Sequence, residues 1–209
     1  MIHPLFGPQL KGLPHVFDFS ENNPKTLKYD PNNFDQFQEV VFSELHSSGA
    51  SWGIGKYLEE RKNILKNYPQ IIAEKRIYHL GLDIIVPKGY ELFAPINAIV
   101  YETGYESGVG NYGGYIILKH EIQNIPFYSF YGHLNTNHQV EKGQRLSGGE
   151  RFGTIGERED SGHWFTHTHL QIMTQQAINE GRMDQGYIAA KDISKIEEYF
   201  PTPYPLFRY

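Results

Sequence analysis

The spacing of hydrophobic residues changes near residue 77. Before that point, two segments place hydrophobic residues three or four positions apart, which is typical of amphipathic helices. The first covers residues 34–45 and ends near Gly49, and the second covers residues 54–65 and ends before Pro69. We therefore expect residues 1–76 to form an N-terminal extension with two short helices packed on the main body.

After residue 77 the pattern consists of short apolar runs separated by glycine and proline. These runs read LDIIVP, APINAIVYETG, GGYIILKHE, FYSFYGHL and THLQIM. Such runs are typical of strands bounded by turns. The sequence predicts a mainly β core over residues 77–176. A C-terminal helix over DISKIEEYF and a tail follow within residues 177–209, and all three parts form one compact unit.

Composition narrows the class of protein. A chain of 209 residues suits one sizeable core, and its 15 Tyr and 13 Phe favour a β-rich fold. The net charge of −5 comes without a basic stripe, so we expect no nucleic-acid partner. We find no membrane-spanning run and no signal-peptide pattern, so we expect a cytoplasmic protein without a membrane partner. With no cysteine in the chain, any metal must use His, Asp, Glu or water.

The stretch FTHTHLQI carries His167 and His169 one residue apart in a predicted strand. Side chains alternate faces along a strand, so both rings point the same way, with Cα atoms about 6–7 Å apart. They could converge on one ligand. Taken alone, they could equally be two polar positions on a solvent-exposed strand face.

Two other segments carry candidate partners. His79 and Asp83 lie four residues apart in HLGLD, a separation of about 13 Å on an extended strand, so they can share one ion only if the chain bends at Gly81. The alternative is a strand-end histidine hydrogen-bonded to a nearby Asp. His133 follows a glycine at the end of an aromatic strand, where it could also be a surface residue.

The combination of these residues suits hydrolytic chemistry. Two imidazoles and one carboxylate are suitable ligands for zinc in a catalytic site, which keeps an open position for water or substrate. Two further imidazoles beside that position could act as a general base and stabilise developing charge.

The segments HLGLD, APINAIV, GGYIILKH, YGHL, VEKGQRLSGGERFGTIG and HTHLQI resemble, in order and approximate spacing, the lysostaphin-type, LytM-like zinc metallopeptidases. The resemblance runs from about Tyr78 to Met173. It implies an antiparallel β-sheet core of the duplicated-hybrid-motif type and one zinc ion per chain. It also implies a peptide or peptidoglycan-like substrate cleaved by metal-activated water.

Carried over residue by residue, the resemblance implies that His79, Asp83 and His169 bind zinc, and that His133 and His167 are the catalytic histidines. The segments GIGKYLEER and GHWFTHTHLQ further resemble the peptidase-like middle module of bacterial multidomain proteins that also carry an aminotransferase-like domain. That subgroup usually has Gly at position 163 and Pro-His-Leu-His at positions 166–169. In this sequence those positions hold His163 and Thr-His-Thr-His, and neither difference removes a proposed ligand.

Two alternatives to a hydrolase remain open. A non-catalytic module could keep the peptidase fold and bind a peptide or protein in its groove. A sugar-phosphotransferase carrier domain has a similar strand architecture and uses two facing histidines, but it has no use for Asp83. His163, in a loop rich in charged residues, could contact substrate or simply be solvated. The sequence does not predict the oligomeric state.

Overall fold

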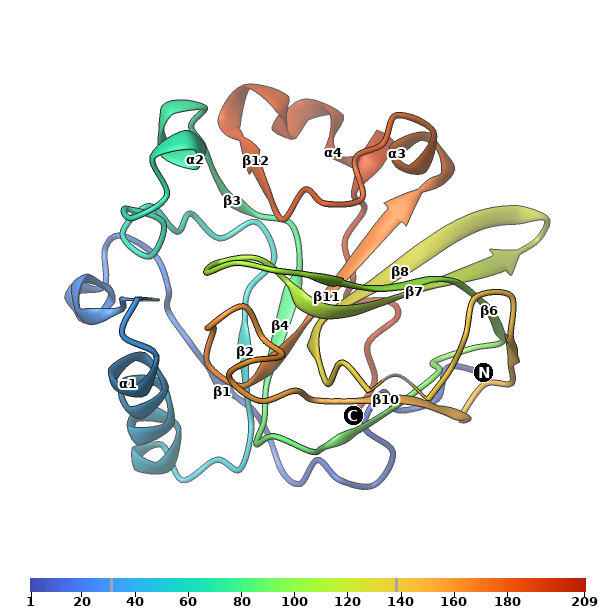
Figure 1. Ribbon diagram of the computed structural model, residues 1–209, viewed down its shortest axis with the longest axis horizontal. Coiled ribbons are helices and arrows are strands. Elements are labelled where there is room, and N and C mark those ends of the chain that lie inside the picture. The colour runs from blue at the N-terminus through green and yellow to red at the C-terminus, as the bar shows by residue number, and fades with distance from the viewer. Residues whose placement is uncertain (31, 138) are drawn as a thin grey trace.

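The computed structural model describes residues 1–30, 32–137 and 139–209. At its centre lies an eight-stranded sheet (Figure 1). In spatial order its strands are β1 (His15–Val16), β2 (Gly53–Gly55), β4 (Leu82–Ile85), β11 (His167–Thr174), β8 (Ile125–Leu134), β7 (Gly113–Ile122), β6 (Ala98–Glu106) and β9 (Arg145–Leu146). β1 runs parallel to β2, and every other neighbouring pair is antiparallel. The prediction of a mainly β, antiparallel core is confirmed.

Two small ribbons and several short helices surround this sheet. One ribbon pairs β5 (Glu91–Phe93) with β10 (Arg151–Thr154), and the other pairs β3 (Arg76–His79) with β12 (Tyr187–Ala189). The α-helices are α1 (Phe34–Ser47), α2 (Pro69–Ala73), α3 (Gln175–Asn179) and α4 (Ile196–Tyr199), and the 3₁₀ helices are η1 (Pro24–Lys28) and η2 (Ala190–Lys195). Figure 1 shows α1 at one side of the sheet and α3 with α4 at another.

The sheet buries side chains on both faces, because alternate residues of each strand point to opposite sides. In β7, Ile116 and Leu118 belong to one buried cluster, together with Leu92 of β5. Ile117 between them belongs to another cluster, which includes Ile196 of α4. The core therefore continues from the β5–β10 ribbon on one face to the β3–β12 ribbon and the C-terminal helices on the other.

Helix α1 confirms the first predicted helix. It starts after Asn33, whose side chain accepts a hydrogen bond from the Gln36 amide at 3.4 Å, as expected of an N-cap residue. Its apolar positions Phe37, Val41 and Leu45 are buried in a third cluster, which also holds Phe17, Phe19, Trp164 and Phe165. The helix thus covers the segment that leads into β11.

The second predicted helix, over residues 54–65, is wrong. Residues 53–55 form β2, where Gly55 pairs with Asp83 of β4, and the next helix, α2, begins only at Pro69. Residues 58–61 bond to β3: the Leu58 amide donates to the His79 carbonyl and the Arg61 amide to the Ile77 carbonyl, both at 2.8 Å, and residues 62–67 form turns. Pairing with distant strands therefore outweighed a helix-like spacing of apolar residues.

The C-terminal helix forms in a shorter and tighter shape than DISKIEEYF predicts. Residues 190–195 are the 3₁₀ helix η2, and only residues 196–199 form the α-helix α4. The tail then returns to the core, with the Phe207 ring 6.0 Å from the Trp52 ring. Within residues 1–30, 32–137 and 139–209, no helix is long and apolar enough to cross a membrane.

Candidate metal centre and groove

The three middle strands of the sheet bring together residues that lie far apart in the sequence. In the register of β11, His169 stands opposite Asp83 of β4 on one side and opposite Gly132 of β8 on the other. His133, the next residue of β8, and His167 of β11 lie close by. The ribbon strand β3 ends at His79, and the chain turns at Gly81 before β4.

His79, Asp83 and His169 converge on one point. The Asp83 Oδ1 atom lies 3.2 Å from His79 Nε2 and 3.3 Å from His169 Nδ1. The two ring nitrogens are 3.0 Å apart, and the possible ligand atoms of the three residues all lie within 4.8 Å of one another. All three side chains are buried. The predicted bend between His79 and Asp83 is therefore present, and it brings both side chains to the same place.

Carbonyl oxygens determine which nitrogen of each ring carries a proton. His79 donates from Nδ1 to the Lys56 carbonyl at 3.1 Å, and His169 donates from Nε2 to Gln171 Oε1 at 2.9 Å. Gln171 keeps that oxygen toward His169 because its own amide donates to the Gln185 carbonyl at 3.0 Å. The facing atoms, His79 Nε2 and His169 Nδ1, are thus lone-pair nitrogens beside a carboxylate oxygen. This donor set fits a divalent cation.

The close approach of His169 depends on Gly81. A Cβ atom at residue 81 would lie 2.4–2.7 Å from three atoms of the His169 ring. Only glycine leaves room for the imidazole at that distance.

His133 and His167 form a second pair beside the first. Their ring centroids are 4.3 Å apart, and His167 Nε2 lies 3.6 Å from Asp83 Oδ1. His133 donates from Nδ1 to the Ser161 carbonyl at 2.8 Å, and His167 donates from Nδ1 to the Phe165 carbonyl at 2.7 Å. Each ring therefore keeps Nε2 as a proton acceptor.

The backbone of His133 has a left-handed conformation, with φ of 62°. This conformation is uncommon for a residue with a side chain. It is held from both sides: the His133 amide donates to the Tyr112 carbonyl at 2.8 Å, and the His133 carbonyl accepts from the Gly156 amide at 3.0 Å. Two neighbouring segments thus determine where the His133 ring points.

Burial keeps His79, His133 and His167 neutral, and Asp83 stays ionised. Burial, reinforced by the Arg61 guanidinium, lowers the pKa of His79 to about 3. Burial also lowers the pKa of His167 to about 4 and that of His133 well below 6.5. Burial alone would raise the pKa of Asp83, but His79 and Arg61 outweigh it and hold that pKa well below 3.8. At neutral pH the group therefore presents unprotonated nitrogens and a carboxylate, the forms that bind metal.

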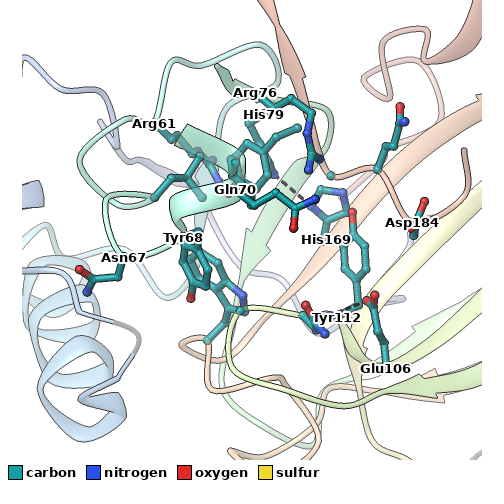
Figure 2. Close-up of a pocket in the computed structure, with 18 of the residues that line it drawn as sticks. Arg61, Asn67, Tyr68, Gln70, Arg76, His79, Glu106, Tyr112, His169 and Asp184 are labelled. Carbon is teal, nitrogen blue, oxygen red and sulfur yellow. Dashed lines mark hydrogen bonds between the residues drawn. The ribbon is translucent and has the colours of Figure 1, made fainter. Parts of the chain in front are cut away.

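These residues form part of the wall of a groove of about 610 Å³ (Figure 2). Tyr68, which precedes α2, and Arg76 of β3 line this groove. Glu106 of β6 and Tyr112, which directly precedes β7, also line it. Tyr187 of β12 completes this part of the lining. The groove is large enough to hold several atoms of a ligand beside the histidines.

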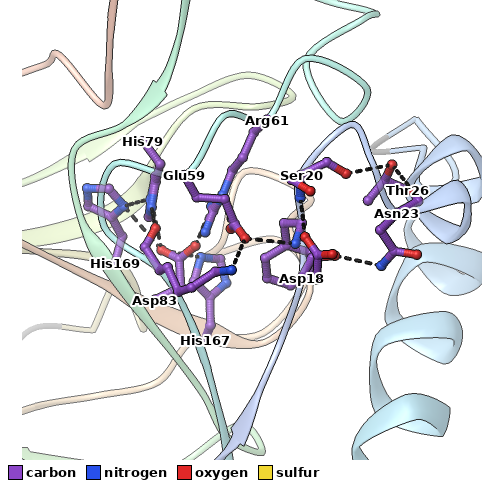
Figure 3. Close-up of polar contacts among 12 residues, drawn as sticks. Asp18, Ser20, Asn23, Thr26, Glu59, Arg61, His79, Asp83, His167 and His169 are labelled. Atoms are coloured by element: carbon purple, nitrogen blue, oxygen red, sulfur yellow. Dashed lines mark hydrogen bonds and ion pairs between the residues drawn. The ribbon is translucent and has the colours of Figure 1, made fainter. Parts of the chain in front are cut away.

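Several residues at the site carry no clear signal in the sequence. Arg61 lies within the segment predicted as an amphipathic helix, where a charged residue is expected on the exposed face, yet its Nη1 atom bonds to Asp83 Oδ2 at 2.6 Å (Figure 3). Lys56 contributes its backbone carbonyl, a group that every residue type has, so the sequence gives no sign of this contact. Only Gln171 could have been found, because it lies two residues after His169 on the same face of a strand.

Two other histidines lie away from the metal centre. His163 is half-buried and is absent from the groove lining formed by the described residues. His120 is buried in β7, where it donates from Nδ1 to the Asn97 carbonyl at 3.1 Å and accepts from the Ser129 hydroxyl at 2.7 Å. These contacts give His120 a structural role.

A mainly β fold with a buried His-Asp-His group, two adjacent histidines and an open groove defines a candidate metal-dependent enzyme. The chain belongs to peptidase family M23, whose family model matches residues 77–182, about half of the chain. No curated protein sequence matches it.

Several solved structures are similar to this chain. One is a zinc containing peptidase from Vibrio cholerae, with 21% identity over 47% of this chain and 28% of that chain, and a TM-score of 0.40. Another is the catalytic domain of the antimicrobial peptidase lysostaphin from Staphylococcus simulans, with 21% identity over 57% of this chain and 80% of that chain, and a TM-score of 0.42. A third is the catalytic domain of the prophage-encoded M23 protein EnpA from Enterococcus faecalis, with 18% identity over 54% of this chain and 75% of that chain, and a TM-score of 0.40. The chain thus spans less than a third of the Vibrio cholerae chain.

Proposed function

We propose that this protein is a zinc-dependent endopeptidase in which His79, Asp83 and His169 hold one zinc ion per chain. The observation that carries the proposal is the arrangement of two lone-pair nitrogens 3.0 Å apart beside the Asp83 carboxylate, in the wall of an open groove. Membership of peptidase family M23 supports a reaction at a peptide or amide bond.

When bound, zinc would act as a Lewis acid and would lower the pKa of a water to about 7. The protein supplies the proton transfers. His133 and His167 each keep Nδ1 bonded to a backbone carbonyl, so their Nε2 atoms accept a proton from the attacking water. The ring that takes up this proton then donates a hydrogen bond from Nε2 to the tetrahedral oxyanion, and it passes the proton to the leaving amine as the C–N bond breaks. The Asp83 carboxylate, 3.6 Å from His167 Nε2, stabilises the positive charge that this ring takes up.

The proposed substrate is an extended peptide or a peptidoglycan-like peptide lying in the groove. The walls contributed by Tyr68, Tyr112 and Tyr187 orient it and exclude bulk water. The likeness to the peptidase-like middle module of bacterial multidomain proteins stays a prediction from the sequence.

The first test is elemental analysis of protein purified without an affinity histidine tag, beside His169→Ala. We expect about one zinc per wild-type chain and its loss in the variant. A peptide-library cleavage assay follows with the zinc-loaded protein. Absence of zinc from wild type after incubation with zinc would contradict the proposal. A full zinc content without cleavage of any peptide would favour the binding-module alternative.

A further inference from the structure

Arg61 is a buried arginine at the back of the candidate metal centre. It comes from the N-terminal extension, outside the part of the chain that matches the family model. Its side chain is 3% exposed, and its Nη1 atom donates to Asp83 Oδ2 at 2.6 Å. The other oxygen of the same carboxylate, Oδ1, faces His79 and His169.

We propose that Arg61 is a positioning residue for the metal centre, holding the Asp83 carboxylate so that only Oδ1 is presented to the cation. This inference rests on the proposed function. A carboxylate with a free second oxygen can rotate or bind through both atoms, whereas Arg61 occupies Oδ2 with a charge-assisted hydrogen bond.

Glu59 holds Arg61 in place. Its Oε2 atom accepts from Arg61 Nε at 3.2 Å, and its Oε1 atom accepts from the Phe19 amide at 3.1 Å (Figure 3). The Arg61 guanidinium also lies 5.0 Å from the centre of the Phe19 ring. Arg61 is thus fixed by a carboxylate, an aromatic ring and its own backbone bond to Ile77, which makes its position independent of a bound metal.

The charges of this group favour a cation. The carboxylates of Glu59 and Asp83 and the guanidinium of Arg61, all buried, together carry one net negative charge beside His79 and His169, while the Lys56 ammonium, 3.2 Å from Glu59 Oε1, is 42% exposed and therefore screened by solvent. Arg61 alone would repel a divalent cation, and Glu59 offsets that repulsion. The arrangement therefore orients Asp83 without losing the attraction for the metal.

The same segment also orients His79, because the Lys56 carbonyl accepts from His79 Nδ1. Two of the three proposed ligands are therefore held by residues 56–61, which pair with β3 through the Leu58 and Arg61 amides. Loss of a hydrogen-bond partner that orients a metal ligand typically lowers metal affinity by about 10- to 100-fold.

The test is the zinc dissociation constant of Glu59→Gln/Arg61→Met, measured by competition with a chromophoric chelator. This double variant removes the Arg61 guanidinium together with the Glu59 carboxylate that pairs with it, so Glu59 is not left as an unpaired buried charge, and Asp83 loses its partner at Oδ2. We expect its dissociation constant to rise by about 10- to 100-fold and the visible absorption spectrum of its Co²⁺ form to shift. The matched control is Arg76→Met, which removes another groove arginine whose partner is Glu74 at 2.6 Å. Its zinc affinity should equal that of wild type.

A folded double variant with wild-type zinc affinity and an unchanged Co²⁺ spectrum would overturn this inference and leave the proposed function intact. Failure of wild type itself to bind zinc would overturn both. If the double variant does not fold by circular dichroism, Arg61→Lys takes its place, because it keeps the buried positive charge but not the forked donors. A rise in its dissociation constant of at least about threefold supports the inference, and wild-type affinity counts against it.

Discussion

His79 Nε2 and His169 Nδ1 face each other at 3.0 Å, although the residues lie at the end of one ribbon and in the middle of the sheet. The other nitrogen of each ring donates to a carbonyl oxygen on the opposite side. Without a cation, two lone pairs meet at hydrogen-bond distance. In the proposed function, both would bind a zinc ion together with Asp83.

Metal binding should therefore stabilise the fold. A ligand that binds only the folded state at 100 times its dissociation constant adds about 2.7 kcal/mol to the free energy of unfolding. We expect zinc to raise the thermal midpoint of wild type and a chelator to reverse this rise, as measured by calorimetry. In His169→Ala the midpoint should not respond to zinc. An equal response in both proteins would place the zinc elsewhere.

His167→Ala should separate catalysis from metal binding. The variant keeps His79, Asp83 and His169, so we expect about one zinc per chain by elemental analysis. It loses a proton acceptor, so turnover of any peptide cleaved by wild type should fall by about 10²- to 10⁴-fold. His133→Ala should behave in the same way. Full activity in either variant would show that its ring has another role.

Gly81→Ala should disturb the metal centre without changing any ligand. The added methyl group would lie 2.4–2.7 Å from the His169 ring, which must move. We expect weaker zinc binding in chelator competition and a loss of about 1–3 kcal/mol in the free energy of unfolding. The control is Gly153→Ala, where a Cβ atom would meet its nearest neighbours at 3.4 Å. Similar zinc affinity in the two variants would argue against a steric role for Gly81.

His120 should make stability depend on pH. Burial lowers its pKa from 6.5 to about 4 in the folded protein, so below pH 6.5 the unfolded chain binds a proton more readily than the folded one. Its stabilising contribution is complete above pH 6.5 and is lost as the pH falls toward 4, by up to about 3 kcal/mol.

The measurement is the free energy of unfolding in urea at several pH values between 7 and 4. The other buried histidines add to the wild-type slope, so His120 is isolated by comparing wild type with His120→Gln, which should have a shallower slope. His46→Gln, which replaces an exposed histidine, serves as the control. Parallel curves for wild type and His120→Gln would contradict the assignment.

The sequence by itself determined the elements whose pattern reflects local burial. Phe37, Val41 and Leu45 recur at helical spacing because they line one face of α1, and the apolar runs after residue 77 match strands buried on both faces. The candidate metal and catalytic residues were predicted from a resemblance to known peptidases. Their roles stay predictions, although the structure brings His79, Asp83, His133, His167 and His169 together.

Only the tertiary structure decided what surrounds those residues. The segment 54–65 has helical spacing, but its backbone pairs with β3 and its Arg61 lies against Asp83, because satisfying a buried carboxylate and strand amides outweighs a weak local preference. The proton positions on His79 and His169 depend on the Lys56 carbonyl and on the Gln171 side chain. Such contacts join segments far apart in the chain. They depend on which segments pack against each other in the folded protein, and the spacing of residues along the sequence does not predict that.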